Sequence, residues 1–280
     1  MSSLVPMSTH SSKLPRPAEY FATHPVFTHA EFVSAHTAGG RSEHTSNAVL
    51  AGHVAAGGLL RVQRGLYATV PPGAETRGFR PDPYLVATRL RPDAVVAYHA
   101  ALAFHGKAYS AWRRHHYVTA ERARPLTFRG DEYIAVQARH PVRALPDFGG
   151  GVVVRPHGGG EARVTSLERC LVDLMHAPQH GGGWEEILRS LETVEFFDLD
   201  DVVKYTLLLE SALTVARVGW LLEQHRETWM VEEKHLAPLL RKAPSGPRYL
   251  DPRRESGKLV ARWNLIVPER ILLRAWEEPT

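Results

Sequence analysis

The most constraining feature of the sequence is the order of segments in its first 70 residues: three short helical patterns, then two strands joined by a tight turn. Pro17–Phe21 suits a short first helix, because proline is well tolerated in a first helical turn. Thr28 and Glu31 have the spacing of a capping box, which predicts the start of a second helix. Gly39-Gly40 ends that helix and makes the turn that follows.

A third helix is expected directly after this turn. Thr45 or Ser46 is predicted to cap it, and it reaches about Ala56, where two further glycines stop it. Its apolar residues recur at helical spacing and are expected to form the buried stripe: Val49, Leu50 and Val54.

Two apolar segments then flank a short polar turn. Leu59–Val62 and Leu66–Val70 are predicted strands, and Gly65 between them permits the positive φ that a tight hairpin needs. Three helices followed by a two-stranded wing make a winged helix-turn-helix, which we predict for residues 17–70.

The rest of the chain divides at a proline-rich stretch. Residues 1–16 lack periodicity and are interpreted as a flexible tail, and residues 71–83 hold four prolines and are interpreted as a linker. Residues 84–280 are predicted to form a larger α+β domain. Helical patterns there begin at Tyr84, Leu167, Trp184, Asp200, Leu213 and Glu233, and short β-rich segments begin at His116, Leu126, Tyr133, Val152 and Arg262. Alternation in these segments favours an antiparallel or mixed sheet.

Charge is distributed unevenly between the two halves. Residues 1–147 carry 17 basic and 10 acidic side chains, for a net +7, and residues 148–280 carry 17 and 20, for −3. A basic front half favours a polyanionic partner through neutralisation of phosphates. A basic stretch with aromatic residues at 112–129 either extends a nucleic-acid surface, binds another anionic partner, or is a solvated face.

The predicted third helix suits the DNA major groove, which is about 12 Å wide and admits one helix. Small or polar side chains let the helix approach base edges, and Asn47 can pair with adenine. Arginines on the wing can hold phosphates or enter the minor groove. The residues predicted to contact DNA are Arg41, Ser42, Ser46, Asn47, Arg61, Gln63, Arg64 and Tyr67. A winged domain that contacts protein instead remains an alternative.

No motif in the sequence completes a catalytic or metal-binding set. The histidines lack zinc-ligand spacing, and the triple glycines lack the Gly-Lys-Ser/Thr of a phosphate loop. Asp131 and Glu132 have no lysine beside them, as a nuclease would need. Cys170, the single cysteine, excludes an internal disulfide and suggests a reducing compartment. We therefore expect a cytoplasmic protein with no enzymatic activity, no cofactor or metal, and no membrane association.

Two segments resemble a known protein family. Phe27–Phe32 through Val54, followed by Leu60–Tyr67, looks like the winged domain of AbiEi-family antitoxins. Arg163–Leu174 resembles the "VTS-x-ERT-LVDL" segment of the same family, with Cys170 where threonine is common. The resemblance runs from about residue 20 to the C-terminus.

This resemblance implies an antitoxin of a type IV toxin-antitoxin system, of the kind that serves in phage defence. The winged domain would repress its own operon by binding inverted repeats in promoter DNA. The C-terminal domain would be needed to neutralise a nucleotidyltransferase-type toxin. A winged-helix-recruited DNA endonuclease and a protein-interaction adaptor are the alternatives, and the operator sequence, the oligomeric state and the mode of toxin control stay open.

Overall fold

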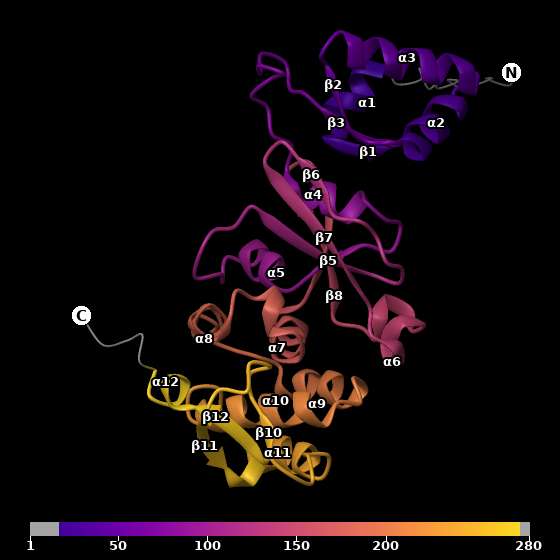
Figure 1. The fold of residues 1–280 in the computed structure, drawn as a ribbon. Coiled ribbons are helices and arrows are strands. Elements are labelled where there is room, and N and C mark those ends of the chain that lie inside the picture. Colours follow the sequence, from indigo (N-terminus) through magenta and orange to yellow (C-terminus); the bar gives the residue numbers. More distant parts are fainter. Residues whose placement is uncertain (1–16, 275–280) are drawn as a thin grey trace, which may run out of the picture. The chain divides into compact units, whose positions relative to one another are not determined.

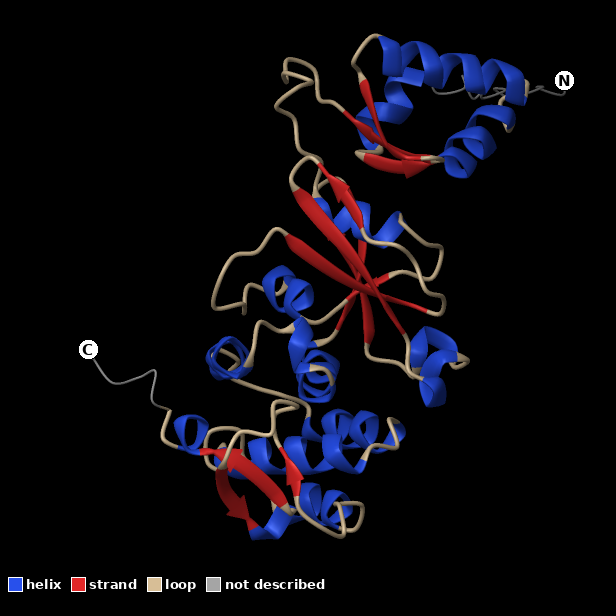
Figure 2. Ribbon diagram, in the orientation of Figure 1, coloured by secondary structure: helices blue, strands red, loops and turns tan. Residues whose placement is uncertain are grey.

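The computed structural model describes residues 17–274, so the tail predicted for residues 1–16 lies outside the described residues. The chain divides into two compact units, each described by itself below. One holds the residues up to Asp82 together with Gly158–Gly160, and the other holds the remaining residues from Pro83 onward. Helices and strands occur in both (Figure 2), and the fold class is α+β, as the sequence predicts.

The first unit contains three helices and a three-stranded antiparallel sheet (Figure 1). Its elements in chain order are α1 (Pro17–Thr23), β1 (Val26–Thr28), α2 (His29–Thr37), α3 (Glu43–Ala55), β2 (Leu59–Gln63) and β3 (Leu66–Thr69). The sheet order is β1-β3-β2. The strand β1 is absent from the sequence prediction, because three residues are too few to show an alternating pattern. Thr28 forms the expected capping box with Glu31.

The start of α3 differs from its prediction. Ser42, and neither Thr45 nor Ser46, is the N-cap: its side chain accepts a hydrogen bond from the backbone N–H of Thr45, at 3.1 Å. Ser42, Thr45 and Ser46 lie within five positions, and each residue type can cap a helix, so composition alone does not select the N-cap.

Aromatic side chains fill the core of the first unit. The buried cluster consists of Tyr20, Phe21, Phe27, Phe32, Leu50 and Leu59. The rings of Phe21 and Phe27 stack with centroids 5.6 Å apart, and those of Phe21 and Phe32 stack at 5.4 Å. Of the apolar stripe predicted on α3, Leu50 is fully buried, whereas Val49 and Val54 are only partly buried against the cluster. Leu50 is thus the main apolar contact of α3 with the core, and much of the surface of α3 stays uncovered.

The second unit is built on a six-stranded mixed sheet of order β6-β7-β5-β4-β9-β8. Its strands are β4 (Val95–Val96), β5 (Arg114–Thr119), β6 (Leu126–Phe128), β7 (Asp131–Gln137), β8 (Val152–His157) and β9 (Gly160–Thr165). β5 and β7 are parallel, with Val118 opposite Val136, so their carboxyl ends meet at one edge of the sheet. The mixed sheet agrees with the expectation, and β4 and β9 are additions to it.

Helices and a small second sheet complete this unit. The helices are α4 (Pro83–Arg89), α5 (His99–Phe104), α6 (His140–Arg143), α7 (Leu167–His176), α8 (Trp184–Glu192), α9 (Leu199–Leu208), α10 (Ala212–Gln224), α11 (Glu233–Leu240) and α12 (Glu269–Leu272). The small sheet has the order β10-β12-β11, from Arg248–Tyr249, Leu265–Pro268 and Gly257–Val260. The strand predicted to start at Arg262 starts only at Leu265, because Ala261–Trp263 forms a 3₁₀ turn that ends at Asn264 with φ +48°.

Candidate nucleic-acid interface

The helix α3 presents a continuous exposed face in which four of six residues are alanine or glycine. The residues that are exposed along this face recur every three or four positions: His44, Asn47, Ala48, Ala51, Gly52 and Ala55. This spacing places them on one side of the helix, opposite the buried Leu50. A long side chain would hold another surface at a distance, so this face can approach a groove closely.

Ser46 does not belong to that face, and the prediction that it reads bases is wrong. Its side chain is fully buried, and its hydroxyl lies 2.7 Å from Nδ1 of His36 and donates to the carbonyl of Ser42 at 3.1 Å. Ser46 therefore joins α3 to α2 and carries no free group toward solvent.

The hydrogen bond to His36 is part of a short chain that holds the turn between the two helices. Arg41 donates from Nη1 to Nε2 of His36, at 2.6 Å. Because a guanidinium only donates, Nδ1 of His36 must carry the ring proton and donate it to Ser46. Burial, and then the charge of Arg41, lower the pKa of His36 below its ordinary 6.5, which keeps the ring neutral. Arg41 itself remains exposed, at the position just before the helix.

Asn47 is exposed and oriented by a partner on another helix. His29, the first residue of α2, has its Nε2 2.6 Å from Oδ1 of Asn47. A carbonyl oxygen only accepts, so His29 donates this hydrogen bond and the amide NH₂ of Asn47 is directed elsewhere. Sequence reasoning missed His29, because the two residues are 18 positions apart and no local pattern links them.

The wing, formed by β2 and β3, carries two exposed arginines. Arg61 and Arg64 are exposed, and neither side chain forms an ion pair or hydrogen bond within residues 17–274. Gln63 is half-buried beside them, at a bulge in the pairing of β2 with β3. Tyr67 is half-buried too, and its ring stacks on Phe27 at 5.8 Å, so it stabilises the wing from within. Gly65 takes φ +80°, the left-handed conformation that the tight turn requires.

The basic stretch at 112–129 lies in the other unit, and some of its side chains form contacts within that unit. Trp112 stacks on the ring of His99 at 3.7 Å and donates from Nε1 to Ser110. Arg114 pairs with Glu132 on the neighbouring strand, at 2.9 Å. These contacts hold the start of β5 in place and reduce the free positive charge of the segment.

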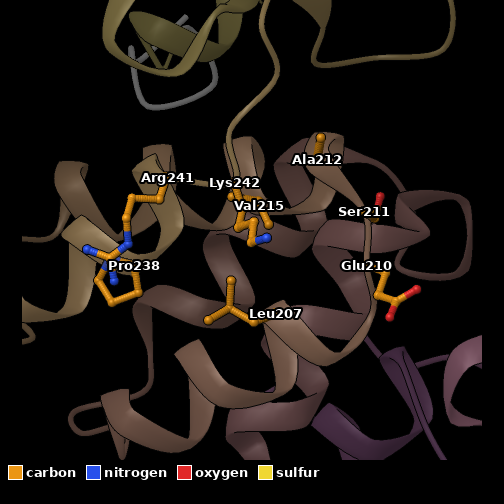
Figure 3. Close-up of a pocket in the computed structure, with 8 residues that line it drawn as sticks. All are labelled: Leu207, Glu210, Ser211, Ala212, Val215, Pro238, Arg241 and Lys242. Carbon is orange, nitrogen blue, oxygen red and sulfur yellow. The ribbon is translucent and has the colours of Figure 1, made fainter.

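A groove of about 550 Å³ lies among α9, α10 and α11 (Figure 3). Its apolar lining comes from Leu207, Val215 and Pro238, and Figure 3 places Arg241 and Glu210 on opposite sides of it. Ser211 beside it caps α10 by accepting from the backbone N–H of Thr214, at 3.4 Å. The charged residues that border the groove are exposed, so solvent screens them.

Residues 17–274 contain no group of three or more His, Cys, Asp or Glu side chains placed to hold a metal ion. No helix in the same range is both long and apolar enough to cross a membrane.

Comparison with known proteins finds likeness at the level of fold. No protein-family model matches the sequence, and no curated protein matches it. The crystal structure of the RV2827C protein from Mycobacterium tuberculosis is similar, with a TM-score of 0.53 and 18% sequence identity over 90% of each chain. At this identity the likeness concerns the fold alone.

Proposed function

We propose that the first unit binds double-stranded DNA, with α3 in the major groove and the β2–β3 wing along the neighbouring backbone. The observation that carries this proposal is the uncovered small-residue face of α3, flanked by the exposed guanidinium groups of Arg41, Arg61 and Arg64. A helix with its side chains is about 10–12 Å across, nearly the width of the groove, so alanine and glycine on the leading face relieve crowding.

Within this proposal the residues divide between two roles. Asn47 reads a base edge with its amide, and Arg61 and Arg64 neutralise phosphates without regard to sequence. Ser42 contributes through the helix it caps, since its hydroxyl accepts from Thr45. Gln63 is the last residue of β2, directly before the wing turn, and contributes a contact to the DNA backbone there. Tyr67 shapes the wing through its ring contact with Phe27.

We further propose that this DNA binding serves an AbiEi-type antitoxin that represses its own operon at inverted repeats. The support is the resemblance of the wing segment Leu60–Tyr67 and of Arg163–Leu174 to that family. The second unit would then take part in neutralising a nucleotidyltransferase-type toxin, in the cytoplasm.

The test is a titration of the full chain with DNA from upstream of its own reading frame. Fluorescence anisotropy should give tighter binding to this fragment than to a scrambled one, and log Kd should change linearly with log salt concentration. Absence of any salt-sensitive DNA binding would contradict the proposal and favour a protein-interaction adaptor.

Two parallel measurements separate the remaining alternatives. Incubation with plasmid DNA and Mg²⁺ or Mn²⁺ should leave the plasmid intact, and cleavage would favour an endonuclease. Co-expression with a nucleotidyltransferase encoded beside it should relieve growth arrest, and failure to do so would contradict the antitoxin proposal while leaving DNA binding standing.

A further inference from the structure

The second unit contains an open pocket lined by polar and apolar residues at the carboxyl ends of β5 and β7, called the cavity below. Its volume is about 320 Å³, which is within the range of small-ligand pockets. Val118 and Val136 of the two parallel strands reach it, and α6 follows β7 directly at its mouth. Ligands of open sheets commonly bind where parallel strands end, because the connecting segments diverge there.

The floor of the cavity is a buried ion pair that is already neutral. Arg169 donates from Nε to Asp173 at 3.3 Å and from Nη1 to the carbonyls of Asp147 and Gly150, both at 2.7 Å. Tyr205 donates to the second oxygen of Asp173 at 3.2 Å, and its ring lies 5.0 Å from the guanidinium. Arg169 and Asp173 therefore satisfy each other and contribute no net charge to a ligand.

Two further guanidinium groups at the cavity have no countercharge. Arg139 is half-buried and donates from Nη1 to His176, and Arg143 is exposed and donates from Nε to the carbonyl of Ala138. Neither forms an ion pair within residues 17–274. His176 lies between Arg139 and Thr214. Burial, and then the charges of Arg139 and Arg217, lower the pKa of His176 to about 4, so its ring is neutral and adds no charge to the cavity. The cavity thus carries an excess of about two positive charges.

A tyrosine hydroxyl at the cavity is without a hydrogen-bond partner among residues 17–274. Tyr98 lines the cavity with 5% of its surface exposed, and its hydroxyl forms no hydrogen bond in the described chain. Its backbone has φ +57°, which side-chain-bearing residues rarely adopt. His180 lies against it, with ring centroids 4.8 Å apart, and also lines the cavity. A tyrosine hydroxyl that no protein group occupies can donate to a ligand in the cavity.

From these observations we propose that the cavity binds the phosphate group of a small phosphate monoester, such as a sugar phosphate or a nucleoside monophosphate. The dianion matches the two uncompensated charges of Arg139 and Arg143, and planar guanidinium groups bind phosphate oxygens with paired hydrogen bonds. Tyr98 donates its free hydroxyl to the same group. The volume leaves room for one organic moiety beside the phosphate. This site lies wholly within the second unit and goes beyond the proposed DNA binding.

The test is calorimetric titration of the full chain at fixed ionic strength with ribose 5-phosphate, adenosine monophosphate, inorganic phosphate and ribose. Either ester should bind at least about tenfold more tightly than inorganic phosphate, and ribose should not bind. Equal affinity for inorganic phosphate would overturn the monoester as the ligand. No heat with any phosphate at millimolar concentration would overturn the site.

Single substitutions of residues that line the cavity test whether the ester binds there. Arg143→Gln and Arg139→Gln should each weaken ester binding by about tenfold or more, the loss expected for one charge-assisted hydrogen bond, and Tyr98→Phe by a smaller factor. Arg143 is exposed, so its replacement leaves the fold intact.

Arg241→Gln, at the groove of Figure 3, is the matched control and should bind like the parent. Unchanged binding in both Arg139→Gln and Arg143→Gln would overturn the assignment. Arg64→Ala should leave ester binding unchanged, so this result is independent of DNA binding.

Discussion

Nε2 of His29 lies 2.6 Å from Oδ1 of Asn47 and donates a hydrogen bond to it across the interface of α2 and α3. This contact fixes the amide that we propose to read a base, and it leaves the NH₂ group of Asn47 available. A preset amide loses less side-chain entropy on binding than a freely rotating one. The first prediction concerns this pair.

Asn47→Ala should relax base preference. The amide NH₂ can donate to adenine N7 while the second lone pair of Oδ1 accepts from adenine N6, and a good bidentate pair of this kind contributes about 1–3 kcal/mol of discrimination. His29→Ala should reduce the same discrimination by a smaller amount, since the amide remains but is no longer held. The measurement is competition anisotropy with single-base variants of the upstream fragment. The two changes should be non-additive in the double variant. Selectivity that survives Asn47→Ala would exclude this residue from base reading.

Arg64→Ala should weaken binding to every DNA sequence about equally. Its exposed guanidinium has no partner within the described chain, so its charge is available for one phosphate. Losing one phosphate contact should reduce the slope of log Kd against log salt by about 0.9. Arg241→Ala removes an exposed arginine from the other unit and should change neither quantity. A slope equal to that of the parent would remove the wing from the interface.

Ser46→Ala should destabilise the first unit and leave base preference unchanged. The substitution removes the acceptor of His36 Nδ1 and the donor to Ser42, both in a buried setting, at a cost of about 1–3 kcal/mol. All six tryptophans lie outside residues 17–82, so fluorescence does not report on this unit. Hydrogen exchange of the α3 amides is the measurement, and exchange should accelerate by about tenfold or more. Altered selectivity with unchanged exchange would restore Ser46 to the interface.

The same hydrogen-bonded chain makes the first unit sensitive to acid. The pKa of His36 is lowered in the folded state, mainly by burial and then by Arg41, so the folded protein binds this proton less readily than the unfolded chain. Stability from this residue is complete above pH 6.5 and decreases as the pH falls below that value. The α3 amides, corrected for intrinsic rates, should exchange faster at pH 5 than at pH 7. In His36→Asn this difference should shrink, and an equal difference in both proteins would contradict the assignment.

Local signals in the sequence predicted much of the fold. The capping box at Thr28 and the glycine at position 65 act over a few residues, so the sequence shows them directly. The burial of Ser46 also follows from local spacing, since Ser46 lies three and four residues before Val49 and Leu50 and so shares the predicted apolar stripe of the helix. The sequence does not show its hydrogen-bond partner, because His36 lies on another helix.

The candidate sites show the same division. The exposed arginines of the wing follow from the hairpin pattern, whereas the orienting contact of His29 depends on how α2 crosses α3. The phosphate cavity draws on Tyr98, Arg139 and Arg169, which are far apart in the chain. The parallel pairing of β5 with β7 brings these regions together, and no short sequence pattern predicts that pairing.

The last prediction concerns the ion pair beneath the cavity. Asp173→Ala would leave the guanidinium of Arg169, which is 2% exposed, buried without its countercharge, and breaking such a pair costs about 3–5 kcal/mol. Arg114→Ala breaks the exposed pair with Glu132, where solvent screening reduces the loss to about 0–1 kcal/mol. Trp184 and Trp220 are buried in the second unit and report its unfolding in urea. The Asp173 variant should unfold at a clearly lower urea concentration than the Arg114 variant. Equal midpoints would mean that the buried charge of Arg169 finds other compensation, and the neutral floor that the phosphate proposal assumes would have to be abandoned.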